Sequence, residues 1–215
     1  KNNAWKVYVL LTFLGLLLGA LMAFKLVHFT YFLVPTLLLF LYSKYLKHYL
    51  LIGNIVIALL ISFVIFLVYE YYFITQCCYQ FSEFDKPLRK IIVIYMFFSF
   101  ITTLIREIIK DIEDVDGDLK ANSKTLPIVI GRKRASKVVF FITCMLFIFL
   151  LIILQYLKKD PLFLTYGVLS ILLPLLYFMY KLWFAKRKKD FSKLSLLMKL
   201  IMFFGILSML LFKFI

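Results

Sequence analysis

Apolar residues dominate this chain in long runs that short polar segments separate. A helix needs about 20 mostly apolar residues to cross the hydrocarbon core of a membrane. Backbone groups in lipid must be satisfied within the segment, which favours helices over open strands. Seven runs reach or approach that length, at roughly 7–24, 26–42, 51–69, 91–105, 138–157, 162–180 and 196–214. The fourth is short, and we expect its helix to continue into the polar stretch after it. The pattern predicts an all-α transmembrane helix bundle.

The composition agrees with this interpretation and excludes the soluble classes. The chain has 215 residues, of which 64% are hydrophobic, whereas a soluble domain is about 45–50% apolar. So many apolar side chains cannot be buried inside one soluble globule. The net charge of +15 would suggest nucleic acid for a soluble protein, but it is also typical of the cytoplasmic loops of membrane proteins. We therefore expect a membrane and no nucleic acid as the partner.

The basic residues are distributed unequally between the two sides of the predicted membrane. One side holds the N-terminus and the loops at roughly 43–50, 106–137 and 181–195, with 18 of the 26 Lys and Arg. The other side holds seven, and Lys199 lies inside the last span. Because Lys and Arg are enriched in cytoplasmic loops, the count predicts that the first side is cytoplasmic. We expect an integral protein of the cell inner membrane.

Six of the eleven acidic residues fall within twelve positions of one cytoplasmic loop. They are Glu107, Asp111, Glu113, Asp114, Asp116 and Asp118. At about 100° per residue on a helix, Asp111, Asp114 and Asp118 share one face. Glu107 lies on that face as well, and Asp116 points away. Carboxylates are hard oxygen ligands suited to Mg²⁺, which also bridges to substrate phosphates. The pattern favours a magnesium site, and the alternative is a solvated acidic loop balanced by nearby Lys and Arg.

The sequence around these acidic residues forms a specific motif. From Arg106 the chain reads Arg-Glu-Ile-Ile-Lys-Asp-Ile-Glu-Asp-Val-Asp-Gly-Asp, and it continues through Thr125-Leu-Pro127 to Gly131. This string resembles the second aspartate-rich motif of the UbiA family of intramembrane prenyltransferases, R-E-x-x-K-D-x-x-D-x-x-G-D followed by T-L-P and a Gly. It is most similar to the branch of digeranylgeranylglyceryl phosphate synthase-like members.

A second segment on the same predicted side agrees with this resemblance. Tyr42-Ser43-Lys44-Tyr45-Leu46-Lys47, followed by Leu51-Ile-Gly-Asn54, is similar to a family segment whose hydroxyl and ammonium groups hold the diphosphate. The alternative is a tyrosine at the membrane interface with lysines whose charged ends reach toward water.

The resemblance implies a Mg²⁺-dependent transfer of a polyprenyl, geranylgeranyl-like group from an allylic diphosphate to a lipid acceptor. An acceptor of this kind is geranylgeranylglyceryl phosphate. The implied catalytic and metal-binding residues are Asp111, Asp114 and Asp118. The implied substrate-binding residues are Tyr42, Ser43, Lys47, Arg106, Lys110 and Lys124. The implied partners are the polyprenyl diphosphate, the lipid acceptor and the membrane, with the active site facing the cytoplasm.

The chain has fewer predicted helices than the family pattern. The family has nine helices and a first aspartate motif of the N-D-x-x-D-x-x-x-D kind after its second helix. This sequence has seven predicted spans, starts with Lys1 in place of Met, and contains no such motif. We therefore expect residues 1–215 to be a single transmembrane prenyltransferase domain, truncated at its N-terminus and inactive as a fragment on its own.

Several other functions remain possible from the sequence. Another family member would prenylate an aromatic acceptor, as in menaquinone or haem synthesis, and a decayed one would bind isoprenyl diphosphate without turnover. A CDP-alcohol transferase would need D-G-x-x-A-R, and the Lys120-Ala121-Asn122 that follows Asp116-Gly117-Asp118-Leu119 counts against it. A transporter would carry ionisable groups deep inside its spans, where only Lys199 lies.

Overall fold

The described part of the chain is helical and contains no strand. The computed structural model describes residues 2–21, 26–46, 49–75, 85–121, 123–156 and 160–214. The chain divides into two compact units, Lys1–Lys47 and His48–Ile215. The predicted all-α bundle is confirmed. That the whole chain forms a single domain stays a prediction.

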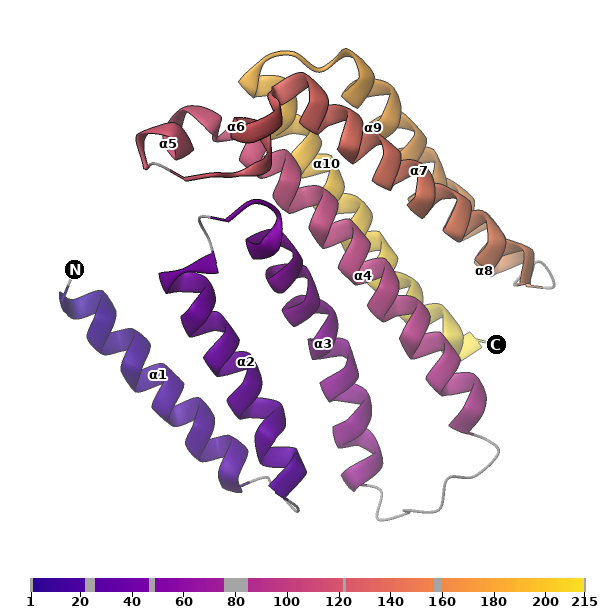
Figure 1. Ribbon diagram of the computed structural model, residues 1–215. Helices are drawn as coiled ribbons and strands as arrows, with labels where there is room; N and C mark the ends of the chain where they lie inside the picture. Colours follow the sequence, from indigo (N-terminus) through magenta and orange to yellow (C-terminus); the bar gives the residue numbers. More distant parts are fainter. Residues whose placement is uncertain are drawn as a thin grey trace. The chain divides into compact units, whose positions relative to one another are not determined.

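The first unit is a helical hairpin. It consists of α1 (Asn2–Leu21) and α2 (Leu26–Lys44), which pack against each other (Figure 1). The two helices come close at Gly19, where an added Cβ would lie 2.6 Å from Cγ of Phe32. Glycine allows this approach because it has no side chain.

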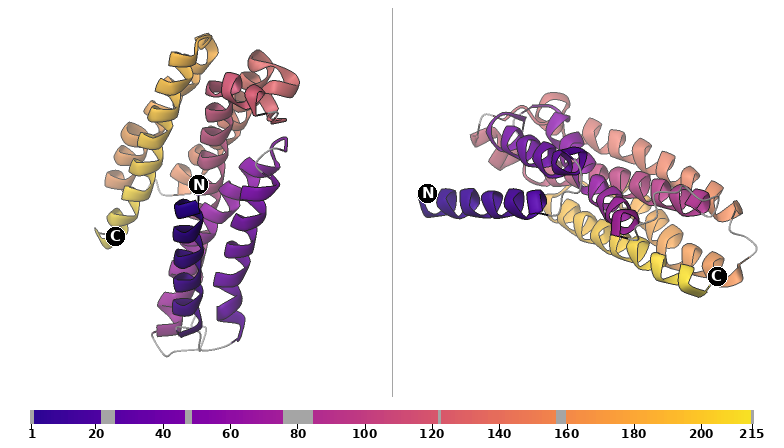
Figure 2. Two further views of the ribbon diagram at one scale, coloured as in Figure 1. Left: turned by 90° about the vertical axis from the view of Figure 1, so that its left-hand side faces the viewer. Right: turned by 90° about the horizontal axis from the view of Figure 1, so that it is seen from below.

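The second unit is built around one long central helix. Its long helices are α3 (Ile52–Thr75), α4 (Asp85–Glu113), α7 (Arg132–Tyr156) and α10 (Lys188–Leu207). The shorter elements are α5 (Val115–Lys120), α6 (Leu126–Ile130), α8 (Pro161–Tyr166), the π-helix η2 (Gly167–Leu172), α9 (Leu173–Phe184) and the 3₁₀ helix η3 (Ser208–Phe214). Helix α4 packs against α3, α7 and α10 (Figure 1 and Figure 2).

The predicted spans coincide with these helices. Among the described residues, five of the seven apolar runs fall on one helix each. The sixth falls on the continuous run α8–η2–α9, and the seventh continues from α10 into η3. The fourth extends to Glu113 as expected. Within the described residues, five helical segments are long and apolar enough to cross a membrane, namely Ile52–Tyr71, Leu88–Glu113, Arg132–Tyr156, Pro161–Phe184 and Lys188–Leu211. The apolar helical segment Trp5–Leu21 is shorter. The chain is an integral membrane protein.

The sixth span shows how the sequence shapes a helix locally. Pro161 starts α8, and Pro174 lies in the first turn of α9 directly after the π-helix η2. Proline lacks the N–H that an α-helical bond requires, so the regular bonding pattern is interrupted at this point. Gly167 begins η2 beside α7, where an added Cβ would lie 2.7 Å from Cδ2 of Leu154.

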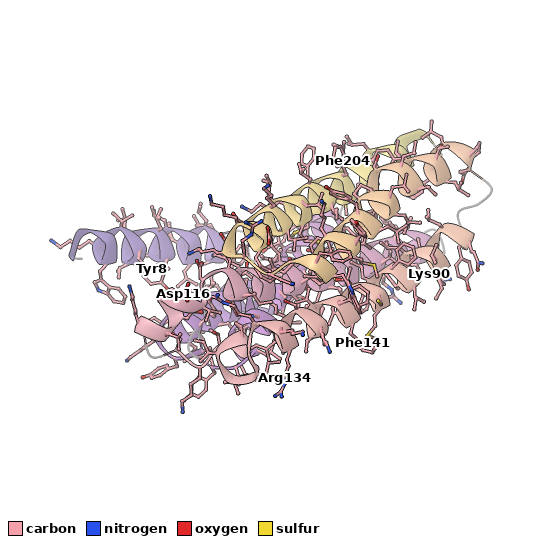
Figure 3. All side chains as sticks on the ribbon, turned by 90° about the horizontal axis from the view of Figure 1, so that it is seen from above. Tyr8, Lys90, Asp116, Arg134, Phe141 and Phe204 are labelled. Carbon is pink, nitrogen blue, oxygen red and sulfur yellow. The ribbon has the colours of Figure 1, made fainter. Side chains whose placement is uncertain are left out.

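The core of the second unit lies between α4, α7, α9 and α10. Fully buried members from three of these helices are Ile108, Val139 and Phe178. Outward faces remain apolar: Phe141 on α7 is 66% exposed and points away from the bundle (Figure 3). Exposed apolar side chains of this kind suit a lipid surrounding, where there is no cost of contact with water.

Two contacts define the register of α4 against α10. The hydroxyls of Tyr95 and Ser208 are 2.6 Å apart, and the Lys188 ammonium lies 3.5 Å from Oδ1 of Asp114. The first pair lies just past the C-terminal end of α10, and the second pair lies at its N-terminal end. The two helices are therefore antiparallel neighbours from Tyr95 to the end of α4.

Candidate functional site

The acidic segment lies where α4 breaks. Helix α4 ends at Glu113, Asp114 has φ −99° and ψ 13°, and α5 begins at Val115. The N–H of Asp114 donates to the carbonyl of Lys110 (2.9 Å), and the N–H of Asp118 donates to that of Asp114 (3.0 Å). The assumption of one continuous helix is wrong. The physical reason is local, because aspartate favours the position just before a helix and the nearby glycine is a weak helix former.

Asp111 is held by a residue of another helix. The side-chain amide of Asn54, in the first turn of α3, donates a 2.7 Å hydrogen bond to Oδ2 of Asp111. Asp111 is half-buried. The charges of Asp118 and Glu107 lie close enough to act on it unfavourably, and that of Lys110 acts on it favourably. The Asp111 carboxylate thus has a defined orientation and a second carboxylate nearby.

The start of α3 explains why Asn54 lies there. Leu51 adopts a positive φ of 56°, which costs a residue with a side chain about 1–2 kcal/mol. Its side chain packs against the hydrophobic core, and its carbonyl accepts the N–H of Ile55 at 2.9 Å. Burial of an apolar side chain offsets the strain. The turn therefore places Asn54 at the beginning of α3, facing the end of α4.

Asp118 is contacted by the segment that follows it. The hydroxyl of Thr125 donates to Oδ2 of Asp118 (3.2 Å), and the N–H of Ser123 donates to its backbone carbonyl (3.0 Å). Thr125 immediately precedes α6, and Pro127 occupies the first turn, where proline is tolerated. Gly131 ends α6 with φ 87° and ψ 149°, a combination that glycine adopts most readily. The Thr125-Leu-Pro127 segment thus folds back onto the acidic segment.

Asp114 faces α10 and a cavity. Its carboxylate forms an ion pair with Lys188, with both side chains about half exposed. Beside it is an open cavity of about 470 Å³ between α4 and α10. The lining residues are Arg106, Lys110, Glu113, Asp114, Ser192, Lys193, Ser195, Leu196 and Lys199. Three residues that the sequence selected, two cationic and one acidic, therefore meet in one space.

Other predicted residues lie elsewhere. Asp116, which the sequence placed off the shared face, is exposed and pairs with Arg132 at 2.8 Å. Lys124 is exposed on the segment between α5 and α6. Tyr42 and Ser43 lie in the last turn of α2, in the first unit. Lys47 lies outside the described residues. The roles of these residues toward substrate stay predictions.

The three predicted metal ligands have different surroundings. Asp111 faces α3, Asp114 faces α10 and Asp118 contacts the segment before α6. Across the described ranges, no three His, Cys, Asp or Glu side chains gather as a metal-binding group. Mg²⁺ commonly uses only one or two carboxylates together with waters and substrate phosphates. Asp111 and Asp118 supply carboxylate oxygens of this kind, and their charges are close enough to interact, so the chemistry of the donor set fits Mg²⁺.

The structure also identifies residues to which the sequence assigned no role. Asn54 and Thr125 lie in the segments that carry the resemblance, but their targets, Asp111 and Asp118, appear only in three dimensions. Lys193 and Ser195 on α10 were not distinguished from other residues of a basic loop and a span. Lys199 alone had a signal, since it is a charge inside an apolar run.

Comparisons with known proteins identify the family of this chain. The sequence profile of the UbiA prenyltransferase family matches residues 1–207. Digeranylgeranylglyceryl phosphate synthase of Methanosphaera stadtmanae is 30% identical over 185 residues, which cover 80% of this chain and 58% of that protein. The protein of the same name from Methanobrevibacter smithii is 31% identical over 138 residues, covering 62% and 43%.

A solved structure has the same fold. A digeranylgeranylglyceryl phosphate synthase structure aligns with a TM-score of 0.70 and 27% identity, covering 96% of this chain and 68% of that one. The chain spans 58% of the length of the Methanosphaera stadtmanae protein that it matches.

Proposed function

Because this chain belongs to the UbiA prenyltransferase family, we propose that it acts in the Mg²⁺-dependent transfer of a geranylgeranyl-like group from an allylic diphosphate to a lipid acceptor. The acceptor is a phosphorylated glycerol ether such as geranylgeranylglyceryl phosphate. Relatives that carry the name digeranylgeranylglyceryl phosphate synthase support this acceptor over an aromatic one. This activity is proposed for the whole natural protein.

One observation carries the proposal. Where α4 breaks, Arg106 and Lys110 line a cavity together with Asp114, and Asp111 and Asp118 lie beside them in oriented contacts. A diphosphate needs cationic groups on its oxygens and carboxylates that hold a divalent cation against it. The bundle below this end is apolar, which suits a prenyl chain. The cytoplasmic orientation of this end rests on its many basic residues.

Each residue of the site has a separate role in such a reaction. Arg106 and Lys110 donate hydrogen bonds to the diphosphate, Asn54 orients Asp111, and Thr125 orients Asp118. A Mg²⁺ ion held by these carboxylates would supply Lewis-acid stabilisation of the leaving charge. The allylic C–O bond breaks, and its electron pair leaves on the diphosphate. The acceptor hydroxyl oxygen forms the new C–O bond and releases its proton.

The proposal is tested by Asp118→Ala in the natural full-length protein. Loss of a charge-stabilising group at a reacting centre costs about 100-fold or more in rate, so Mg²⁺-dependent transfer from geranylgeranyl diphosphate should fall by at least that factor. Asp116→Ala is the matched control, because Asp116 lies in the same segment but pairs with Arg132. It should keep most of the activity.

Transfer is measured with labelled geranylgeranyl diphosphate, and membrane insertion is checked by detergent extraction and size-exclusion chromatography. A wild-type rate from the Asp118 variant would overturn the site assignment. Preferential transfer to a naphthoate or haem acceptor would overturn the acceptor assignment.

A further inference from the structure

The cavity between α4 and α10 contains a lysine that belongs to a membrane-spanning segment. Lys199 lies near the middle of the candidate span Lys188–Leu211 and lines the cavity. A charged side chain inside a span is costly and normally faces a polar cavity or a partner of opposite charge. In the part of the chain that the structure describes, no carboxylate forms an ion pair with Lys199. A bound anion would supply the missing charge.

The register of α4 against α10 shows how far into the bundle the cavity extends. Since Asp114 faces Lys188 and Tyr95 faces Ser208, Lys199 lies level with Thr103, about one turn deeper than Arg106. Lys193 and Lys199 are separated by about 9 Å along α10 at 1.5 Å per residue. The cavity is therefore long enough for more than one anionic group.

The charges in the cavity are unbalanced. Its lining contains four cationic side chains and two acidic ones, and one of these acids, Asp114, pairs with a lysine outside the lining. Arg106 pairs with Glu107 on its own helix. Outside the lining, Asp190 on α10 interacts electrostatically with Lys193. The lining itself still holds more cationic than acidic side chains, and the buried side chain of Ser195 lies between Lys193 and Lys199 in sequence. Lysine is a common point-charge ligand of phosphate.

We propose that Lys193, Ser195 and Lys199 bind the phosphate monoester of the lipid acceptor. This inference rests on the function proposed above and names the part of the site that recognises the acceptor. A phosphate monoester carries about −1.5 to −2 charges at pH 7, which two ammonium groups neutralise, while a serine hydroxyl donates a hydrogen bond. The site would select a phosphorylated glycerol ether over an acceptor without phosphate.

The geometry favours the acceptor over the donor as the ligand of Lys193, Ser195 and Lys199. The donor diphosphate requires the carboxylates that hold the metal, and Asp111 and Asp118 are oriented by Asn54 of α3 and by Thr125. Lys193 and Lys199 come from α10 and share one cavity with Arg106 and Lys110 of α4. A diphosphate on the α4 cations and a phosphate on the α10 lysines would therefore lie side by side, each with its own cationic groups.

The test uses the natural full-length protein in neutral phosphatidylcholine nanodiscs. The variants are Lys193→Gln and Lys199→Gln, with Lys199→Arg to retain the charge. Lys189→Gln is the matched control, because Lys189 is exposed on the same helix outside the cavity lining. The measurements are KM for each substrate and equilibrium binding of geranylgeranylglyceryl phosphate and of the corresponding ether without phosphate.

Each glutamine variant should weaken binding of the phosphorylated acceptor about tenfold, since a hydrogen bond to a charged group contributes this much or more. The KM for geranylgeranyl diphosphate should change less than twofold, and binding of the ether without phosphate should not change. Lys199→Arg and Lys189→Gln should bind the phosphorylated acceptor as the wild type does.

Two results would overturn the inference. One is a raised KM for the diphosphate with unchanged acceptor binding, which would assign these lysines to the donor. The other is unchanged binding of both substrates, which would leave the lysines with a structural or membrane-surface role. Absence of prenyl transfer by the wild type would instead refute the proposed function, and the binding measurements would still decide whether the cavity recognises a lipid phosphate.

Discussion

Four aspartates of one short segment have four different partners. Asp111 accepts a hydrogen bond from Asn54, and Asp118 accepts one from Thr125. Asp114 and Asp116 instead form ion pairs with Lys188 and Arg132. Neutral hydrogen-bond donors orient a carboxylate and leave its charge available to a cation, whereas an ammonium or guanidinium neutralises it. This difference separates Asp111 and Asp118 from the other two.

Asn54 is therefore expected to act as a positioning residue for Asp111. Loss of a group that orients a metal ligand reduces metal affinity about tenfold or more. Asn54→Ala should raise the Mg²⁺ concentration that half-activates prenyl transfer by about that factor, as measured by a Mg²⁺ titration of the full-length protein. Ile52→Ala is the control, because Ile52 is an exposed residue in the same turn.

A purely structural role for Asn54 would give a different result. The variant would then unfold at a lower temperature than the wild type, and its Mg²⁺ requirement would stay unchanged.

Among the elements, the pair α4 and α10 is central to the second unit. These two helices line the cavity at one end and pack closely together near the other. The close contact is at Gly205, where an added Cβ would lie 2.3 Å from Cε1 and 2.5 Å from Cζ of Phe98. Phe98 is buried in the core. The ring fits against α10 only because residue 205 has no side chain.

Gly205→Ala should consequently destabilise the protein. Overpacking of a buried contact costs about 1–3 kcal/mol, so the midpoint of thermal unfolding in detergent should fall. The double variant Gly205→Ala with Phe98→Leu should recover part of the loss, because the smaller side chain leaves room for the methyl group. Gly15→Ala is the control, since an added Cβ there meets no atom within 4 Å. Equal midpoints for the variants at positions 15 and 205 would contradict this account.

Across the whole molecule, the ends of the second unit differ in chemistry. One end contains α5, α6 and the connection between α9 and α10, and the opposite end contains the end of α7 and the start of α8 (Figure 1). The first end contains the acidic segment, the cavity and most basic side chains of the unit. The excess of Lys and Arg predicts that this end is cytoplasmic.

Cysteine labelling tests this orientation. In a background with Cys77, Cys78 and Cys144 replaced by serine, Lys186→Cys should react with a membrane-impermeant maleimide only after the membrane is opened. Asp160→Cys, at the other end, should react in intact cells because its end faces outward. Labelling of position 186 in intact cells, or of both positions from one side, would contradict the predicted orientation.

Hydropathy was sufficient to predict the helices because their hydrogen bonds are local. In lipid every backbone group must be satisfied within its own segment, so an apolar run of sufficient length already determines a spanning helix. The seven runs and the extension of the fourth helix follow from this rule. The break at Asp114 could not be seen from periodicity, since the angular argument treats every residue as equally helical, although Gly117 offered a weak local signal.

The candidate site was only partly determined by sequence. The sequence motif predicted the acidic segment together with Arg106 and Lys110, because the order and spacing of these residue types are visible in the sequence. The partners were decided by tertiary structure: Asn54 and Asp111 are 57 positions apart, and Lys199 shares a cavity with Arg106 through the packing of α10 on α4. Hydrogen bonds and ion pairs act over a few ångströms, so they depend on which helices become neighbours, and hydropathy is almost the same for every arrangement of the helices.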